Sequence, residues 1–406
     1  ELNRFLEKGP TRKELERVKI QTISVFVRGM ESIGGFGGKS DILASNYIYT
    51  GDPAHYKMEL DWIKNATRNQ LRDTAKKWLS DGLYQLEIRP FPKLSTQVTN
   101  VDRSAIPEPG KAPDVSFEPY QRATLSNGMN VIVAQRSAVP VVQMMLSIDA
   151  GYASDQFTSP GLARLAMNML DEGTENRTSL EINEQLSMLG AGLSAGSNLD
   201  TSIVSLTSLT TTLEDSLDIF ADVILNPAFP EKEMDRLKTQ QINAIKREQV
   251  SPQSMALRVF PRLVYGAGHA YSNPFSGSGT IETVENIKVT DLQRFHDTWF
   301  KPNNSTLIVV GDTSLDAIQP MLEKRFAAWK QGEVPSKNIS VVKRAEKPTI
   351  YLIDRPESVQ SVIIGGHVTT PKSNPIEIPT ILMNEVLGGA STSRVNMNLR
   401  EDKGWS

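Results

Sequence analysis

The sequence predicts an α+β protein built from duplicated domains. Helix-like and strand-like patterns alternate along its 406 residues. One pattern also occurs twice: a helix ending in Trp78 leads into an alternating strand, and the same arrangement returns at Trp299. The separation of about 220 residues is far longer than a solenoid repeat, so it favours duplication of whole domains. At roughly 100 to 200 residues per domain, the chain is expected to hold two to four of them.

The first part of the chain is expected to be mainly helical. Thr11, followed three residues later by Glu14, forms a capping-box pattern at the start of a helix over 11–30. A glycine cluster at 34–38 interrupts the chain, and a second helix is expected over 67–80. Residues 83–88 alternate like a half-buried strand. Helices followed by a closing strand are typical of the end of a domain. We therefore assign residues 1–95 to the C-terminal part of a preceding domain.

A proline-rich segment follows this first part. Six of the 23 prolines fall between Pro90 and Pro119, a composition that favours extended, semi-rigid backbone. We therefore expect an interdomain linker over 96–118.

Residues 119–340 are expected to form one complete domain. Asn127-Gly128 lies between two apolar runs, which is a strong hairpin signal because both residues tolerate positive φ. Apolar residues at helical spacing and a second capping box, Thr178 with Glu181, identify the helices. In chain order we expect a strand over 141–148, a helix over 162–170, a helix from Thr178 to Gly190, a strand over 202–209, and helices over 213–225 and 231–249.

The last part repeats the opening of this domain. The strand pattern at 142–146 is matched by one at 359–364, and a helix is expected around Ile381 to Asn384. Residues 341–406 are therefore interpreted as the beginning of a following, truncated domain. Because the chain opens at Glu1 without Met and stops at Ser406 without a polar tail, we expect a fragment of a longer protein.

Composition excludes several functions. The 44 Lys and Arg against 47 Asp and Glu give a formal charge of −3, which disfavours nucleic acid as a partner. The absence of cysteine excludes disulfides, thiolate metal sites and cysteine nucleophiles. No apolar run approaches the roughly 20 residues that a membrane-spanning helix needs.

Two features of the sequence are candidates for binding sites, a glycine-rich stretch and the histidines. The glycine-rich stretch 34–40 ends in Gly-Lys-Ser, but a phosphate-binding loop needs glycine at the position of Ile33, so a flexible turn is favoured over a nucleotide site. The four histidines, His55, His269, His296 and His367, have no second ligand at helical spacing, and each is expected to be structural or exposed.

The stretch from Pro160 to Thr174 resembles the signature helix of the insulinase/pitrilysin family of zinc peptidases, which carries an inverted HxxEH motif between Gly-Leu-Ala and Gly-Thr. Further agreements in the same order run across most of the chain, at 225–229, 265–271, 299–304, 310–312 and 399–406. The resemblance implies duplicated α/β sandwich-like domains of the insulinase and mitochondrial-processing-peptidase type, each with an antiparallel-rich sheet covered by helices. It implies that residues 1–95 end a peptidase-like domain and that 119–340 form a degenerate one.

The positions of the HxxEH motif, which hold two zinc-binding histidines and a glutamate base, correspond here to Arg164, Asn168 and Met167 respectively, with Ala244 at the third ligand position, eight residues ahead of Pro252. A permanently charged guanidinium cannot donate a lone pair, a thioether is a weak zinc ligand, and alanine offers no donor. We therefore predict that none of the four binds zinc and that the chain has no catalytic residue of its own. Arg164 is either a surface residue or a fixed charge that replaces zinc beside an acid.

The resemblance thus implies the non-catalytic half of the substrate chamber of a zinc endopeptidase, with the zinc site upstream of Glu1. The alternative is an inactive scaffold or partner subunit of the same family. The expected partners are a peptide or unfolded protein substrate, and either the catalytic half of the same protein or an active sibling subunit. Zinc is expected in the full-length protein only. Because large relatives in bacteria are often exported, the compartment leans towards the periplasm or cell envelope.

Overall fold

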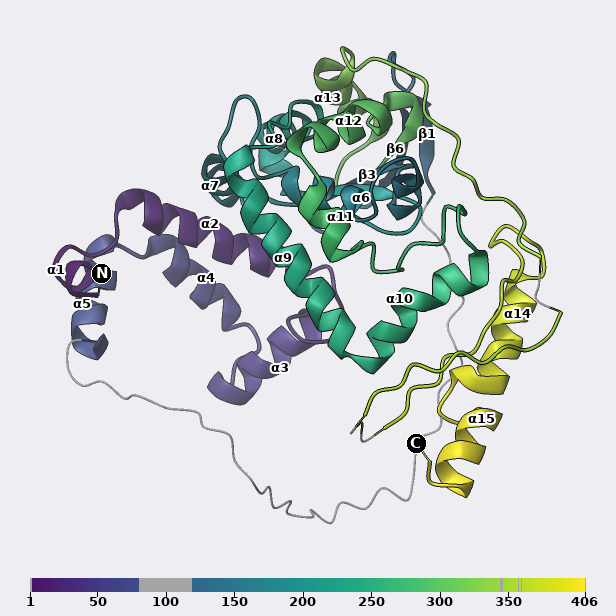
Figure 1. Cartoon of the computed structure of the whole chain (residues 1–406). Coiled ribbons are helices and arrows are strands. Elements are labelled where there is room, and N and C mark those ends of the chain that lie inside the picture. The colour runs from purple at the N-terminus through teal and green to yellow at the C-terminus, as the bar shows by residue number, and fades with distance from the viewer. Residues whose placement is uncertain (1, 80–118, 344–345, 357, 359, 406) are drawn as a thin grey trace.

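The computed structural model describes residues 2–79, 119–343, 346–356, 358 and 360–405. At its centre lies a sheet with helices packed on it (Figure 1). The sheet has six strands in the order β1-β2-β6-β3-β5-β4. Only β2 and β6 pair in parallel, and every other neighbouring pair is antiparallel. This confirms the predicted α+β class with an antiparallel-rich sheet. The strands are β1 (Gln121–Thr124), β2 (Asn130–Gln135), β3 (Val141–Ile148), β4 (Gly192–Ser197), β5 (Ser202–Leu209) and β6 (Ser305–Gly311).

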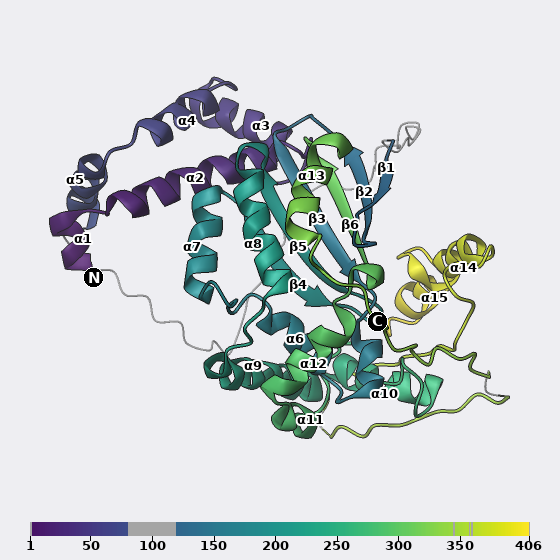
Figure 2. The same ribbon diagram turned by 90° about the horizontal axis from the view of Figure 1, so that it is seen from above.

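One face of the sheet is buried under helices. Alternate residues of β3, β5 and β6 are buried, as the period of two in a half-covered sheet requires. The core is completed by apolar side chains from the covering helices (Figure 2). These helices are α6 (Leu162–Met169), α7 (Ser179–Leu189), α8 (Leu213–Leu225), α9 (Glu231–Val250), α12 (Val289–Trp299) and α13 (Leu315–Phe326).

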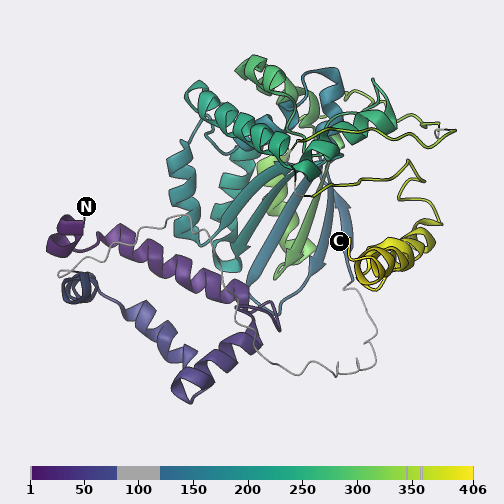
Figure 3. The same ribbon diagram turned by 60° about the horizontal axis from the view of Figure 1, so that its bottom comes forward.

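The opposite side of the sheet, called here the open face, is the side turned towards the viewer in Figure 3. Most of these side chains are half-buried or exposed, including Gln143 and Val310. The register aligns them in rows across the sheet: Thr207 with Gln143 and Val310, Ser205 with Met145 and Ile308, and Ile203 with Ser147 and Thr306. From β4, Gly192, Ser194 and Gly196 join these rows.

The helix boundaries predicted within residues 119–340 are confirmed closely. Both capping boxes form, Thr11 with Glu14 and Thr178 with Glu181. The Asn127-Gly128 turn joins β1 to β2, with Gly128 at φ +85°. The predicted strand at 83–88 and the linker at 96–118 lie outside the described residues.

The N-terminal residues form helices that reach the sheet domain. These are α1 (Leu2–Lys8), α2 (Arg12–Gly29), α3 (Lys39–Thr50), α4 (Tyr56–Asn65) and α5 (Arg68–Leu79). Helix α2 packs against α7 (Figures 1 and 2). The two helices meet at Gly190, where Ser24 is fully buried and Arg28 Nη1 donates to the Gly190 carbonyl oxygen over 2.7 Å. The helical segment thus contacts residues more than 160 positions further along the chain.

Replacing Gly190 with alanine is expected to weaken this contact. Gly190 has φ +64°, and a Cβ there would lie 2.0 Å from Ser24 Oγ. Left-handed strain and the forced shift of Ser24 together should lower the free energy of unfolding by about 2 kcal/mol. Gly196→Ala is the matched control, because its Cβ would meet nothing within 4 Å. Thermal unfolding of the two variants measures the difference, and equal stabilities would contradict the expectation.

The remaining helices complete the described chain. They are α10 (Pro252–Tyr265), α11 (Ile281–Asn286), α14 (Glu377–Asn384) and α15 (Arg394–Asn396), with 3-10 helices at Tyr152–Phe157, Thr210–Thr212 and Pro302–Asn304 and π-helical turns at Glu385–Gly389 and Met397–Asp402. Within the described ranges, no helix has both the length and the apolar character needed to cross a bilayer.

The prediction of a strand over 359–364 is wrong. The described residues 360–364 have no regular secondary structure, and Ile363 is 93% exposed. A strand needs a neighbour to accept its backbone hydrogen bonds, and no strand pairs with this segment among the residues described. The helix predicted just after it is present as α14.

Candidate functional site

Helix α6, which carries the signature positions, begins at a buried carboxylate. Asp155, in the 3-10 helix Tyr152–Phe157, accepts hydrogen bonds from the backbone amides of Gly161 (2.8 Å) and Ala163 (2.9 Å). These amides lie at the free N-terminal end of the helix, where no intrahelical acceptor exists. Burial raises the pKa of Asp155 to about 7, although the backbone hydrogen bonds oppose this rise. Asp155 therefore fixes where the helix starts.

The four signature positions lie on two helices that pack together, α6 and α9. Met167 is 1% exposed and belongs to the core, whereas Asn168 is exposed. Arg164 is half-buried, and its Nη1 donates to the backbone oxygen of Ser276 over 3.0 Å. Ala244 is half-buried on α9. The helix frame is thus retained, but it presents none of the nitrogen or carboxylate donors that zinc binding requires.

Arg164 matches neither of its two expected roles. It is not a fully solvated surface residue, and its recorded partner is a backbone carbonyl rather than an acid. An acid on the same loop contact is Glu248, which lies one turn beyond Ala244 on α9 and bonds to the Ser276 side chain. Glu248 Oε2 accepts hydrogen bonds from Ser278 Oγ (2.8 Å) and Ser276 Oγ (3.2 Å) and pairs with Arg258. Glu248 is therefore engaged in holding the 276–278 loop against α9 and α10.

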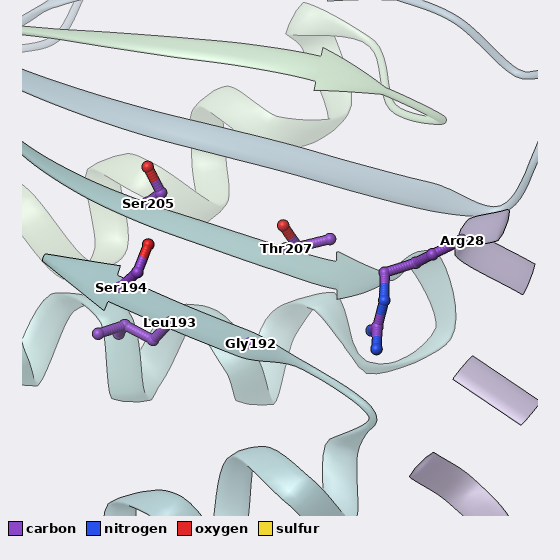
Figure 4. A pocket seen from close by; sticks show the side chains of 6 residues that line it. All are labelled: Arg28, Gly192, Leu193, Ser194, Ser205 and Thr207. Atoms are coloured by element: carbon purple, nitrogen blue, oxygen red, sulfur yellow. The ribbon is translucent and has the colours of Figure 1, made fainter. Parts of the chain in front are cut away.

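A hollow of about 320 Å³ opens beside the free edge of the sheet (Figure 4). It is lined by Arg28, Gly192, Leu193, Ser194, Ser205 and Thr207. The three hydroxyl-bearing residues lie on the open face, where Ser194 pairs with Ser205 and Gly192 pairs with Thr207. Beyond its bond to the Gly190 carbonyl, Arg28 has no further partner within the described residues, and it forms no ion pair with them. Donor groups therefore gather here, and the three hydroxyls have no acceptor among the residues that the structure describes.

The histidines do not converge, and across residues 2–79, 119–343 and the described remainder no group of three His, Asp or Glu side chains is placed to hold a metal. His269 accepts from the Tyr271 amide (3.0 Å) and contacts the Ser340 oxygen through Nε2 (3.1 Å). His296 is mostly buried, and its Nε2 contacts the Ile224 oxygen at 2.8 Å. Burial lowers the pKa of His296, so the imidazole remains neutral at pH 7 and donates this bond.

Residues 130–266 match the family profile described as "Insulinase (Peptidase family M16)", and residues 286–406 match the one described as "Peptidase M16 inactive domain". The first match contains α6 and all four signature positions. The chain belongs to the insulinase family of peptidases. The predicted family is thereby confirmed.

Relatives of this insulinase-family chain include proteins named as zinc proteases. "Uncharacterized zinc protease YmxG" of Bacillus subtilis (strain 168) is 24% identical over 285 residues, which cover 70% of this chain and 68% of that protein. Mitochondrial-processing peptidase subunit beta of Caenorhabditis elegans is 24% identical over 337 residues, covering 80% and 68%. Among solved structures, the peptidase M16 inactive domain from Pseudomonas fluorescens matches with a TM-score of 0.60 at 24% identity, covering 70% of this chain and 68% of that chain. This last likeness supports the fold.

The glycine-rich stretch 34–40 of this family member does not form an anion cradle. The amides that would hold a phosphate are already bonded: Lys39 N to the Ser32 oxygen (2.9 Å), Ser40 N to the Ile33 oxygen (2.9 Å) and Gly37 N to Asp41 Oδ2 (2.7 Å). The carboxylate of Asp41 also places negative charge where an anion would lie. The structure therefore supports the turn that the sequence favoured.

Three features of the site were missed from the sequence. Asp155 caps α6 from six residues away across a turn, so no capping pattern of fixed spacing marks it. The hollow combines Arg28 with residues of β4 and β5, which are far apart in the chain. Glu248 lies one helical turn from Ala244, and this spacing is a signal that could have identified it.

Proposed function

We propose that this chain forms the non-catalytic part of a zinc-dependent endopeptidase of the insulinase family and contributes a wall of its substrate chamber. Residues 1–95 end one peptidase-like domain, 96–118 link it to the degenerate domain at 119–340, and 341–406 begin the next. The catalytic zinc is held by another domain of the same protein. The chain's own catalytic and metal sites are absent in this proposal.

The observation that carries the proposal is the state of helix α6. Its apolar face is intact, with Leu162, Leu165 and Met169 each at most 1% exposed. The positions where the family places its ligands and base hold Arg164, Met167 and Asn168 instead, and Arg164 is bonded to a loop carbonyl. Retained packing with replaced donors is what a structural role predicts. The side chains at positions 164, 167, 168 and 244 are not suited to bind zinc.

The open face supports the role of chamber wall. It offers the backbone of the edge strand β4, apolar side chains such as Met145 and Ile308, and hydroxyls at the hollow that have no partner among the described residues. Such a surface can contact an unfolded peptide through backbone hydrogen bonds without selecting one sequence.

Metal analysis tests this proposal. We expect far less than one zinc per chain by elemental analysis after equilibration with Zn²⁺, and no hydrolysis of an unfolded protein by the chain alone. The triple variant Arg164→His, Asn168→His and Ala244→Glu is the positive control, because it restores two imidazoles at i and i+4 with a carboxylate on α9. One zinc per wild-type chain, lost on replacing a residue among 164, 167 and 168, would overturn the proposal.

The second candidate is an inactive partner subunit. The role of a subunit is favoured by the match to a protein named as subunit beta of a processing peptidase, which covers 80% of this chain. The proposed inactivity rests on the residues at 164, 167, 168 and 244. The two candidate functions differ in the location of the zinc-binding motif. Under the first it is encoded in the same reading frame, whereas under the second a separate sibling chain must co-purify with this one and restore cleavage when added.

A further inference from the structure

We propose that Asn127-Gly128 is a modification site, at which water converts the asparagine to aspartate or isoaspartate when the end of helix α13 moves away from the turn. The site lies between β1 and β2, outside the signature positions and the hollow, so the inference does not depend on the proposed chamber role. The reaction needs no enzyme, and its rate is set by how often the fold releases the turn.

The dipeptide itself is chemically reactive. Asn-Gly occurs at this one position of the sequence, and asparagine is among the thermolabile residues. Glycine has no side chain to hinder the approach of its backbone nitrogen to the preceding side chain. The Gly128 nitrogen loses its proton and bonds to Cγ of Asn127, the Cγ–Nδ2 bond breaks, and the amide group leaves with that proton as ammonia. Water then opens the resulting succinimide at either carbonyl, which gives aspartate or isoaspartate.

In the closed turn, each reacting group is held by another part of the chain. The Gly128 amide donates to the Leu125 oxygen over 2.8 Å. The leaving group, Asn127 Nδ2, donates to the Phe326 oxygen over 2.7 Å, and Oδ1 of the same side chain accepts from the Met129 amide over 3.0 Å. Asn127 is only 8% exposed, so water has little access to it. Attack on Cγ therefore requires the side chain to leave its partners first.

The clamp on this turn comes from α13 and the residues just after it. Glu323 accepts hydrogen bonds from the backbone amide and the hydroxyl of Ser126, over 2.8 and 2.6 Å. Gln331 Nε2 donates to the Asn127 backbone oxygen over 3.0 Å. Gln331 also covers Gly128, because a Cβ built there would lie 2.3 Å from its Nε2 atom. These contacts tie the turn to residues 197 to 204 positions further along the chain, and the turn is released when they break.

Modification would prevent the turn from closing again. In the native turn the side-chain NH2 group donates to the Phe326 oxygen. Aspartate offers a carboxylate instead, so two acceptors would face each other. Isoaspartate routes the backbone through the side chain and adds one carbon atom to the turn, whose length fixes the register between β1 and β2. Either product therefore leaves a permanent record that the end of α13 has been detached.

Peptide mapping by mass spectrometry tests the inference on the full chain. The chain and a synthetic peptide of residues 122–132 are incubated at pH 8, and conversion of Asn127 to aspartate or isoaspartate is followed over time. We expect conversion in the folded chain to be at least about tenfold slower than in the peptide, because local opening must precede the reaction. Gln331→Ala and Glu323→Ala should each accelerate conversion several-fold. The matched control Lys330→Ala changes an exposed residue beside Gln331 and should keep the wild-type rate.

A distant destabilising variant separates local release from a general loss of stability. Gly190→Ala is expected to weaken the contact between α2 and α7 and should not accelerate conversion of Asn127. Conversion in the folded wild-type chain as fast as in the peptide, or wild-type rates in both Gln331→Ala and Glu323→Ala, overturns the inference. An equal acceleration in Gly190→Ala also overturns it, because the reaction would then follow global unfolding.

The failure to close again is tested with a variant that reproduces one product. Asn127→Asp should lower the Tm by at least about 3 °C. Asn130→Asp adds the same charge at an exposed position of β2 and is the matched control, with a smaller change in Tm expected. Equal Tm values for the two variants would show that the turn accepts the carboxylate and would overturn this step of the inference.

Discussion

Replacing Asp222 with alanine is expected to lower the free energy of unfolding by about 3 kcal/mol or more. Asp222, on α8, is 6% exposed and accepts hydrogen bonds from Thr174 Oγ1 (2.7 Å), Asn176 Nδ2 (2.8 Å) and Asn226 Nδ2 (3.0 Å), and it pairs with Arg177. Its removal leaves several donors without an acceptor and a half-buried guanidinium without a counter-charge. Urea unfolding at pH 7 measures the loss.

The same residue gives the effect a definite pH dependence. Burial alone would raise the pKa of Asp222, but the hydrogen bonds from Thr174, Asn226, Asn176 and Arg177 outweigh it and hold the pKa below the usual 3.8. A lowered pKa means that the stabilisation is complete above pH 3.8 and is lost as the pH falls through the lower folded-state value. The gap between wild type and Asp222→Ala should therefore shrink in strong acid. Asp215→Ala, an exposed acid on the same helix, should change stability by less than about 0.5 kcal/mol, and a similar loss there would contradict the argument.

Replacing Asp155 with alanine should cost about 3 kcal/mol at mildly acidic pH. The change leaves the buried amides of Gly161 and Ala163 without their acceptor, and each such orphan costs roughly 1 to 3 kcal/mol. Asp155→Asn keeps one side-chain oxygen as an acceptor but places its NH2 group against the second backbone amide. We therefore expect about half the loss of stability caused by Asp155→Ala. Chemical denaturation of both variants at pH 5 measures these differences.

The pH dependence at Asp155 has the opposite sign to that at Asp222. Its pKa is raised from 3.8 to about 7, so the folded protein holds a proton that the unfolded chain releases between these values. The stabilisation is complete below pH 3.8 and is lost as the pH rises through about 7. The gap between wild type and Asp155→Ala should accordingly narrow from pH 5 to pH 8. A gap that stays the same over this interval would contradict this, because it would mean that the buried carboxyl is already ionised in the folded protein at pH 5.

Local signals predicted those parts of the fold whose cause is local. A capping box and a terminal glycine predicted the two ends of α7, and alternation with a period of two predicted the bounds of β5. Strand β4 carries no comparable signal, because Gly192, Ser194 and Gly196 have low strand propensity and its conformation comes from pairing with β5. The strand expected at 359–364 failed for the converse reason, since propensity without a neighbour does not make a strand.

The candidate site also has features that the sequence predicts and features that it does not. The replacement of zinc donors at Arg164 and Ala244 can be read from residue types alone, because the chemistry belongs to each side chain. The partner of Arg164 could not be foreseen, since Ser276 lies 112 residues away and offers only its backbone oxygen. The hollow was equally out of reach, because one of its walls comes from α2 and the others from a sheet edge.

The position of β6 affects how the domain is made on the ribosome. β6 is the last strand of the sheet to be synthesised, yet it lies between β2 and β3 and pairs with both. The two halves of the sheet, β1-β2 and β3-β5-β4, therefore have no contact through strands until residue 311 has left the exit tunnel. Nascent chains arrested before that point would expose two unfinished strand borders, which makes them natural clients for chaperones.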